Sequence, residues 1–296
     1  MAVEPRDTWV SVFRAATRRP CEERALVLGA MQIEHVVSEQ IDGCHLLVPV
    51  ASAAAARDQI RLYQAENPVG STPVLPAVAP RRGVALGFAF ALVVLAAFQL
   101  QARFAFGIDW TSLGAADAGA IRAGEWWRAL TALLLHGDAA HVAGNVVFGA
   151  FFGYLAGQYV GSGVAALAIV LAAGSGNLLN AALQAPGHSS IGASTAVFAA
   201  LGLVGTTVFA LSRRYALGWA RRWAPVVGAV ALLAYTGTGD ENTDIVAHLT
   251  GFAAGAVAGL VVARLSDIAR AGQASAGVAA LVLLAVGWAI PLALAP

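Results

Sequence analysis

The fold class is set by SSIGASTAVFAALG (residues 189–202), a short polar loop that leads directly into an apolar run of small residues. A second apolar run, DIVAHLTGFAAGAVAG (244–259), carries a single histidine, His248. Polar side chains are expensive to keep inside a bilayer, so a serine and a histidine in two such runs indicate a functional site. The two stretches predict a membrane protein in which Ser194 and His248 act as a nucleophile and its base.

The composition extends the membrane prediction to most of the chain. Of its 296 residues, 58% are hydrophobic and 12% are charged, and the mean hydropathy is +0.71. Soluble domains carry about 25% charged residues, so this chain is predicted to be polytopic, with the lipid bilayer as its surroundings. The net charge of +1 creates no field that would attract nucleic acid, and we expect no nucleic-acid partner.

Seven segments meet, at least loosely, the length of about 20 apolar residues that a membrane-crossing helix needs. We therefore predict an all-α membrane domain over residues 83–296. The expected spans are residues 83–102, 138–158, 163–183, 193–211, 223–239, 244–264 and 276–295.

The N-terminal part of the chain has a different pattern. Residues 1–67 predict a small α+β domain, with helices at 23–31 and 51–67 and short strands at 33–40 and 44–50. Residues 68–82 are rich in proline and small residues, which is typical of a semi-extended linker. The first 45 residues contain no apolar core of a signal peptide, so we expect this domain in the cytoplasm.

The arginines near the span ends predict the orientation of the membrane domain. Arg81 and Arg82, the four arginines at 213–222, and those at 264 and 270 all fall inside if the N-terminus is cytoplasmic. The second, fourth and sixth spans then run inwards, with their polar residues within about 10 Å of the outer boundary. We expect the site to open to the outer face of a cell membrane. Abundant alanine, glycine and arginine without lysine favour the inner membrane of a bacterium.

The spacing around each polar residue suggests its role. Gly192 precedes Ser194 in a turn that enters a helix, which can expose the hydroxyl and direct backbone amides at an anion. His248 is followed by glycines every four residues, which let another helix approach closely. Two structural alternatives stay open: Ser194 can be a helix cap or a small contact residue, and His248 can be a buried ring bonded to a carbonyl group.

Two further polar residues lie on one face of the second span. His141 and Asn145 are four residues apart and can donate hydrogen bonds to a developing oxyanion, or bond to a neighbouring helix instead. The adjacent His136 can brace the preceding loop or act as another donor. His188 is interpreted as a solvated loop residue. A metal site formed by the histidines is disfavoured, because HExxH is missing and no carboxylate sits inside a span, so we expect no metal and no cofactor.

Four motifs, in this order, resemble those of the rhomboid family of intramembrane serine proteases. They are EWWRALTALLLH (125–136), HVAGN (141–145), IGASTAVFAALG (191–202) and DIVAHLTGFAAG (244–255). The resemblance implies a rhomboid-like six-helix bundle with one added C-terminal transmembrane helix, preceded by a small N-terminal domain that some bacterial members also have. It implies hydrolysis of peptide bonds in or near transmembrane segments of substrate proteins.

The resemblance also implies roles for individual residues. Ser194 would be the nucleophile and His248 the general base of a dyad, and the oxyanion hole would consist of His141, Asn145 and the Ser194 amide. Supporting positions are His136, Gly192, Phe198, which would stack on the catalytic histidine, Gly251, Gly255, and the structural pair Trp127 and Arg128.

One residue departs from the family pattern. Thr195 follows the nucleophile where the family usually has glycine, and its extra bulk bears on the shape of the pocket. The alternative to a protease is a catalytically silent relative that binds transmembrane helices. Labelling of Ser194 by a fluorophosphonate would discriminate between the two.

Overall fold

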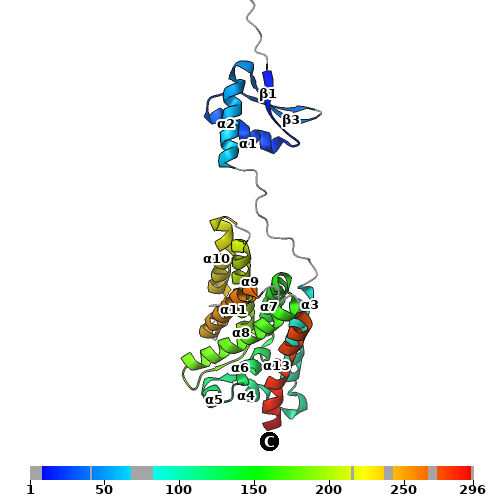
Figure 1. The fold of residues 1–296 in the computed structure, drawn as a ribbon. Coiled ribbons are helices and arrows are strands. Elements are labelled where there is room, and N and C mark those ends of the chain that lie inside the picture. The colour runs from blue at the N-terminus through cyan, green and yellow to red at the C-terminus, as the bar shows by residue number, and fades with distance from the viewer. Residues whose placement is uncertain are drawn as a thin grey trace, which may run out of the picture. The chain divides into compact units, whose positions relative to one another are not determined.

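The computed structural model describes residues 9–40, 42–67, 83–214, 217–236, 243–265 and 272–294. The chain divides into two compact units, Met1–Thr72 and Pro73–Pro296, which are described separately (Figure 1). The boundary falls within the expected linker of residues 68–82, which itself lies outside the described residues.

The N-terminal unit is a three-stranded antiparallel sheet with two helices. Its strand order is β1-β3-β2, and a buried core that includes Leu28, Leu46 and Val48 lies between the sheet and the helices. The structure contains both expected helices and both expected strands, and adds β1, whose alternating pattern is interrupted by a register shift between Ser11 and Phe13. The elements are β1 (Trp9–Ala15), α1 (Arg18–Ala30), β2 (Val36–Gln40), β3 (Gly43–Pro49), η1 (Val50–Ser52) and α2 (Ala53–Glu66).

The membrane unit is a bundle of long helices joined at one end by a series of short elements. Its long helices are α3 (Val84–Ala102), α7 (Ala139–Val160), α8 (Ser162–Leu183), α9 (Ser194–Arg214), α10 (Trp219–Thr236), α11 (Ile245–Arg264) and α13 (Gln273–Leu294). Its short elements are η2 (Ala105–Gly107), α4 (Trp110–Gly114), β4 (Ala116–Asp117), α5 (Ala118–Arg122), α6 (Arg128–Thr131), η3 (Ala132–Leu134) and β5 (Ser189–Ser190).

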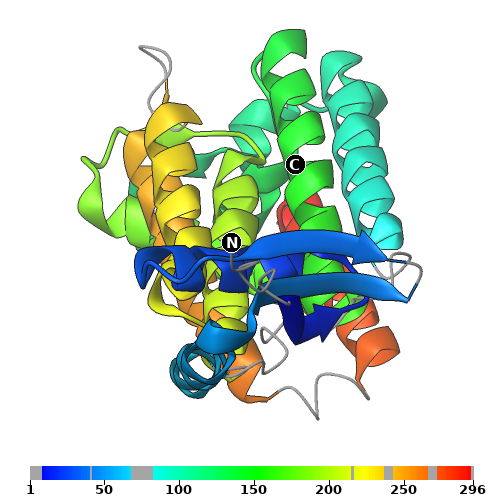
Figure 2. The ribbon, with the colours of Figure 1, turned by 90° about the horizontal axis from the view of Figure 1, so that it is seen from above.

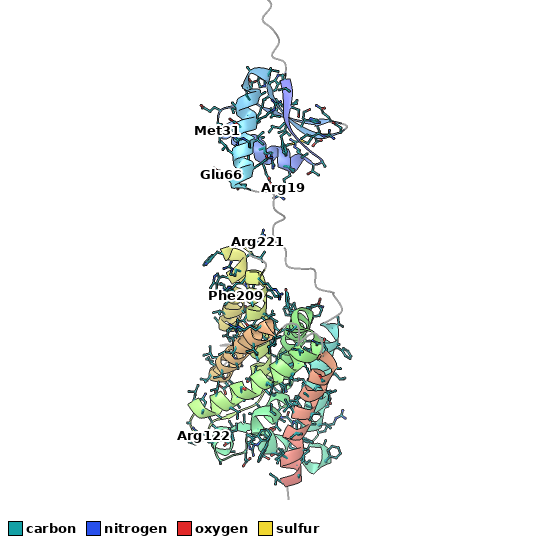
Figure 3. All side chains as sticks on the ribbon, viewed as in Figure 1. Arg19, Met31, Glu66, Arg122, Phe209 and Arg221 are labelled. Atoms are coloured by element: carbon teal, nitrogen blue, oxygen red, sulfur yellow. The ribbon has the colours of Figure 1, made fainter. Side chains whose placement is uncertain are left out.

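Six of these helices, α3, α7, α8, α9, α11 and α13, are long and apolar enough to cross a membrane. The prediction of a polytopic, mainly helical membrane protein is confirmed. α10 corresponds to the expected fifth span, but its described part does not reach the same composition, since its first turn contains Arg221 and Arg222. Arg221 lies at the opposite end of the unit from Arg122 (Figure 3).

α9 is the central helix of the membrane unit. It packs against α7, α8, α10 and α11, whereas α3 and α10 lie on opposite sides of the unit (Figure 2). α11 approaches α9 closely because a side chain at Gly255 would overlap the backbone of Ala199, and one at Gly259 would overlap Thr206. The glycine stripe therefore brings the helix that carries His248 against the helix that carries Ser194.

The segment between α3 and α7 packs mainly against α8 and α13. Its strand β4 pairs with β5, with Ala116 opposite Ser190, and so connects this segment to the loop that precedes α9. α4 also lies beside α13 (Figure 1). The rings of Trp110 and Trp288 contact each other there, with their centroids 5.1 Å apart. The segment between α3 and α7 thus consists of short elements that pack on the bundle.

Candidate active site

A cavity of about 1090 Å³ lies at the end of the bundle where α7, α9 and α11 begin. Side chains from these three helices and from the loop before α9 line it, and they include His141, Asn145, Ser194 and His248. The four polar residues that the sequence analysis placed at one depth therefore share one cavity. Its other polar lining residues are Asp138, His188, Ser189, Ser190, Thr243 and Asp244.

Ser194 is the first residue of α9, and the turn before it is held by two backbone hydrogen bonds. The Gly192 N–H donates to the Ala132 carbonyl oxygen (3.0 Å), and the Ala193 N–H donates to His136 Nε2 (3.3 Å). Gly192 has φ +135°, a conformation that favours glycine. A Cβ there would lie 2.8 Å from His141 Nε2 and 3.5 Å from Ser194 Oγ, so the absence of a side chain at Gly192 leaves room for the His141 ring and the Ser194 hydroxyl.

His248 is buried on α11, one turn after the start of that helix. Its ring packs against Phe198 of α9, with ring centroids 4.4 Å apart and planes inclined by 38°. Phe198 is one helical turn beyond Ser194, and both side chains line the cavity. The expected contact between this aromatic ring and His248 is present.

His141 and Asn145 lie in the first two turns of α7. Asp138 caps this helix, because its Oδ1 accepts a hydrogen bond from the His141 N–H (2.8 Å). That bond holds the pKa of the Asp138 carboxyl below its ordinary value. Asn145 Nδ2 donates to the His141 carbonyl oxygen (3.1 Å), which leaves its second N–H able to donate into the cavity.

His136 is a buried acceptor, which supports a bracing role over that of an oxyanion donor. Its Nε2 accepts the Ala193 N–H, so the neutral ring carries its hydrogen on Nδ1. Burial, together with the nearby His141 ring, lowers the pKa of His136 to about 4. Its backbone is fixed as well, since Gln101 of α3 donates to the His136 carbonyl oxygen and accepts from its N–H, both at 2.9 Å.

Comparison with known proteins identifies the unit that contains this cavity. Residues 123–265 match the family model of the Rhomboid domain, and the match includes every candidate site residue. A curated relative, Rhomboid-like protease 3 of Toxoplasma gondii, is 32% identical over 143 residues, which is 48% of this chain and 54% of the relative. Residues 123–265 of this chain form a Rhomboid domain. The aligned region covers about half the length of that relative, and the N-terminal unit lies outside the match to the family model.

Trp127 and Arg128 of the rhomboid domain lie in the segment between α3 and α7, away from the cavity lining. The Arg128 guanidinium forms a 2.6 Å ion pair with Glu125 and donates to the carbonyl oxygens of Ser112 (3.1 Å) and Ala115 (3.0 Å). It therefore ties α6 to the end of α4 and to the turn before α6. Trp127 packs edge-on against Trp126, with ring centroids 6.3 Å apart.

Thr195, where this chain departs from the rhomboid family pattern, points away from the cavity. Its side chain is 2% exposed, and its hydroxyl donates to Asn177 Oδ1 of α8 (2.9 Å). Its methyl group occupies the space between Gly176 and Gly251, because a Cβ on Gly251 would lie 2.8 Å from Thr195 Cγ2. The extra bulk thus fills the junction of α8, α9 and α11, and it does not narrow the pocket beside Ser194.

His188 is not the solvated loop residue that the sequence suggested. Its Nε2 lies 2.7 Å from Asp244 Oδ2, and the Asp244 side chain is only 12% exposed. Sequence reasoning also missed the bracing amides Gln101 and Asn177, although a carboxamide in an otherwise apolar span was a usable signal. Among the described residues, no group of three or more His, Cys, Asp or Glu side chains is arranged to hold a metal ion.

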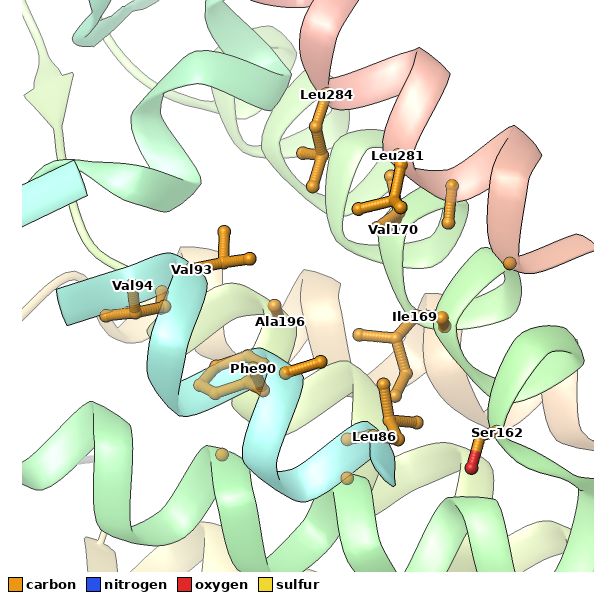
Figure 4. A pocket seen from close by; sticks show the side chains of 18 of the residues that line it. Leu86, Phe90, Val93, Val94, Ser162, Ile169, Val170, Ala196, Leu281 and Leu284 are labelled. Atoms are coloured by element: carbon orange, nitrogen blue, oxygen red, sulfur yellow. The ribbon is translucent and has the colours of Figure 1, made fainter. Parts of the chain in front are cut away.

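A second cavity of about 340 Å³ lies on another side of α9 and is almost entirely apolar. Side chains of α3, α8 and α13 line it, among them Phe90, Val170 and Leu284 (Figure 4). Ala193 and Ala196 form part of its wall. None of the proposed catalytic side chains lines it, so the larger cavity is the candidate active site.

Proposed function

We propose that this chain is an intramembrane serine endopeptidase that hydrolyses peptide bonds in or near the transmembrane segments of membrane proteins. The single observation that supports it most is the cavity shared by Ser194, His248, His141 and Asn145 within a rhomboid domain. In this proposal Ser194 is the nucleophile and His248 is its general base, and both act without a cofactor.

The acylation step requires a proton acceptor beside the serine. Ser194 Oγ attacks the carbonyl carbon of the scissile peptide bond, while the hydroxyl proton passes to the neutral His248 ring. The tetrahedral intermediate collapses when the carbon–nitrogen bond breaks and His248 returns the proton to the leaving amine. An ester between Ser194 and the N-terminal part of the substrate remains.

Negative charge on the carbonyl oxygen needs donors that are already in place. The Ser194 backbone N–H is in the first turn of α9, where a helix has no acceptor of its own for this group. The His141 ring N–H and the second Asn145 N–H face the same cavity and complete the proposed oxyanion hole. One such donor contributes about 100- to 1000-fold to the rate in other serine hydrolases.

The deacylation step consumes water, which the cavity can admit because polar side chains line it. His248 accepts a proton from the water, the resulting hydroxide attacks the ester carbon, and the proton then goes to Ser194 Oγ as the ester bond breaks. This restores the serine and the neutral histidine.

The arrangement in the membrane is part of the proposal. The arginine distribution supports a cytoplasmic N-terminal domain and an active site that opens to the outer face of a bacterial inner membrane. Substrates would be membrane proteins whose transmembrane segments reach the cavity through the bilayer.

The test combines labelling with cleavage, using the full chain in detergent or liposomes. Wild type should react with a fluorophosphonate at Ser194 and cleave a single-pass transmembrane substrate. Ser194→Ala should lose the label, and Ser194→Ala and His248→Ala should each reduce cleavage by at least about 1000-fold. Ser189→Ala is the matched control, because Ser189 lines the same cavity from an exposed position.

Two results would contradict the proposal. Normal cleavage by the Ser194 or His248 variant would remove the dyad assignment. A folded wild type that neither reacts with the fluorophosphonate nor cleaves would instead indicate the catalytically silent relative.

A further inference from the structure

A single carboxylate joins three elements at the rim of the cavity. Asp244 Oδ1 caps α11 by accepting the Ala247 N–H (3.0 Å). Asp244 Oδ2 accepts hydrogen bonds from Asn180 Nδ2 in the last turn of α8 (2.6 Å) and from His188 Nε2 in the loop before α9 (2.7 Å). The start of α11 is thereby connected to α8 and to the loop that leads to Ser194.

This carboxylate lies close to the groups proposed to do the chemistry. Asp244 and His188 both line the cavity, and the His248 N–H donates to the Asp244 carbonyl oxygen one turn along α11 (3.1 Å). His188 is six residues before Ser194. The His188–Asp244 pair therefore bridges the loop of the nucleophile and the helix end of the base.

The main chain of the loop is fixed independently on its other side. Ser189 pairs with Asp117 across β5 and β4, and the Ala118 N–H donates to the His188 carbonyl oxygen (2.9 Å). Loss of the His188 side chain would leave these bonds in place. It would remove one of the two side-chain hydrogen bonds from the loop to Asp244 and leave the one from Ser190, so the effect is expected on the relative position of α11 and not on the loop backbone.

The hydrogen-bond donors around Asp244 stabilise its charged form. Burial alone would raise the pKa of Asp244, but hydrogen bonds from the Ala247 N–H, His188, Asn180 and Ser190 hold that pKa below its ordinary value. The carboxylate is thus ionised and needs its donors. An imidazole with hydrogen on Nε2 donates in its neutral and its protonated form, so His188 can keep this contact in either state.

We propose that His188 and Asp244 are positioning residues, which hold the His248 end of α11 at the correct separation from Ser194. This role rests on the proposed protease function. Neither residue transfers a proton or touches the reacting atoms. Their contribution is to the geometry in which Ser194 and His248 meet the substrate, so their loss should lower kcat more than it changes KM.

The test measures kcat and KM for cleavage of a single-pass transmembrane substrate by the full chain in detergent. His188→Ala should reduce kcat by about 10- to 100-fold with little change in KM. His188→Gln keeps an N–H at the position of Nε2 and should remain within about three-fold of wild type. Gly187→Ala, at the preceding position and outside the cavity lining, should be unchanged, since a Cβ there would have nothing within 4 Å.

A double-mutant cycle separates positioning from general stability. If the pair acts as one unit, Asp244→Ala combined with His188→Ala should reduce kcat no further than Asp244→Ala alone. Circular dichroism and thermal unfolding show whether each variant is folded. Should His188→Ala fail to fold, the comparison is between His188→Gln and His188→Asn, since the shorter asparagine cannot reach Asp244.

The outcomes are distinguishable from those of the proposed function. Wild-type kcat in His188→Ala, or a glutamine variant as slow as the alanine or asparagine variant, would overturn the positioning role while leaving the dyad intact. A lower melting temperature with unchanged kcat per folded molecule would overturn it too, because that is a structural effect. A wild type that neither labels at Ser194 nor cleaves would overturn both proposals.

Discussion

The two cavities of the membrane unit share one helix but differ in every chemical respect. Ser194, Val197 and Phe198 of α9 face the larger cavity, which histidines, carboxylates and serines line. Ala193, Ala196 and Ala200 face the smaller one, which is apolar. Each set follows helical spacing, and the second set begins one residue before the first.

This difference shows how the first turns of α9 separate the polar candidate active site from an apolar packing surface. Neighbouring residues on a helix point about 100° apart, so one residue is enough to pass from one environment to the next. Thr195 faces a third environment, the buried junction with α8 and α11. Substitutions at these faces should therefore have separable effects on activity and on stability.

The largest expected effect concerns His136, which braces the turn before α9, and appears as a pH dependence. Folding holds the pKa of His136 at about 4, whereas the ring in the unfolded chain has its ordinary pKa of 6.5. As the pH falls below 6.5 the unfolded state takes up the proton first, so roughly 3 kcal/mol of stability should be lost by pH 4. Thermal unfolding of wild type and of His136→Gln between pH 7 and pH 4 measures it. Parallel pH profiles for the two proteins would contradict the neutral bracing role.

The next effect should be measured as a loss of activity. Gly192→Ala places a Cβ against the His141 ring in a backbone conformation that alanine rarely adopts. We expect cleavage to fall by about 100-fold, because a displacement near 1 Å at the site can cost that much. The measurement is kcat/KM, with Gly187→Ala as the control, since a Cβ there would have nothing within 4 Å. Equal activity of both variants would show that the conformation of the turn at Gly192 does not determine the geometry of the active site.

A smaller effect, on stability, is expected at the buried face of α9 that carries Thr195. Thr195→Val removes the hydroxyl that Asn177 accepts from, and should reduce the free energy of unfolding by about 1–2 kcal/mol while leaving KM unchanged. Thr195→Ser keeps this hydrogen bond and loses only the methyl group. Thermal unfolding and substrate kinetics of the two variants, side by side, show whether Thr195 acts through stability. A changed KM in either variant would mean that it shapes the pocket after all.

The smallest effect should be on the apolar side. Ala196→Val adds two methyl groups that can enter the cavity of about 340 Å³, so the free energy of unfolding should change by less than about 1 kcal/mol. Cleavage and fluorophosphonate labelling should equal those of wild type. A large loss of activity in this variant would mean that the two sides of α9 are not independent.

Much of the membrane fold could be predicted from local signals. Apolar segment length gave the spans, and the glycines at 251, 255 and 259 predicted that α11 approaches α9. The close packing of Phe198 on His248 was expected only from the resemblance to the rhomboid family. Each of these predictions depends on spacing within one segment or on a motif, and both are visible in a single sequence.

What the sequence did not reveal depends on contacts between distant segments. The side-chain direction of Thr195 depends on Asn177 in another helix, and the pairing of His188 depends on Asp244, 56 residues away. The strand β1 was missed because its pairing with β3 is long-range and irregular. The roles of the proposed catalytic residues stay predictions until the labelling and cleavage experiments are done.

Two glutamines outside the matched region show where the folding unit ends. Gln101 of α3 clamps the backbone of His136, and Gln273 of α13 accepts the N–H groups of Gly163 and Val164 at the start of α8. Both side chains hold residues within 123–265 from positions that lie beyond it. A fragment trimmed to the family boundaries would therefore lose the hydrogen bonds from Gln101 and from Gln273. The smallest fragment worth purifying thus starts before α3 and includes α13.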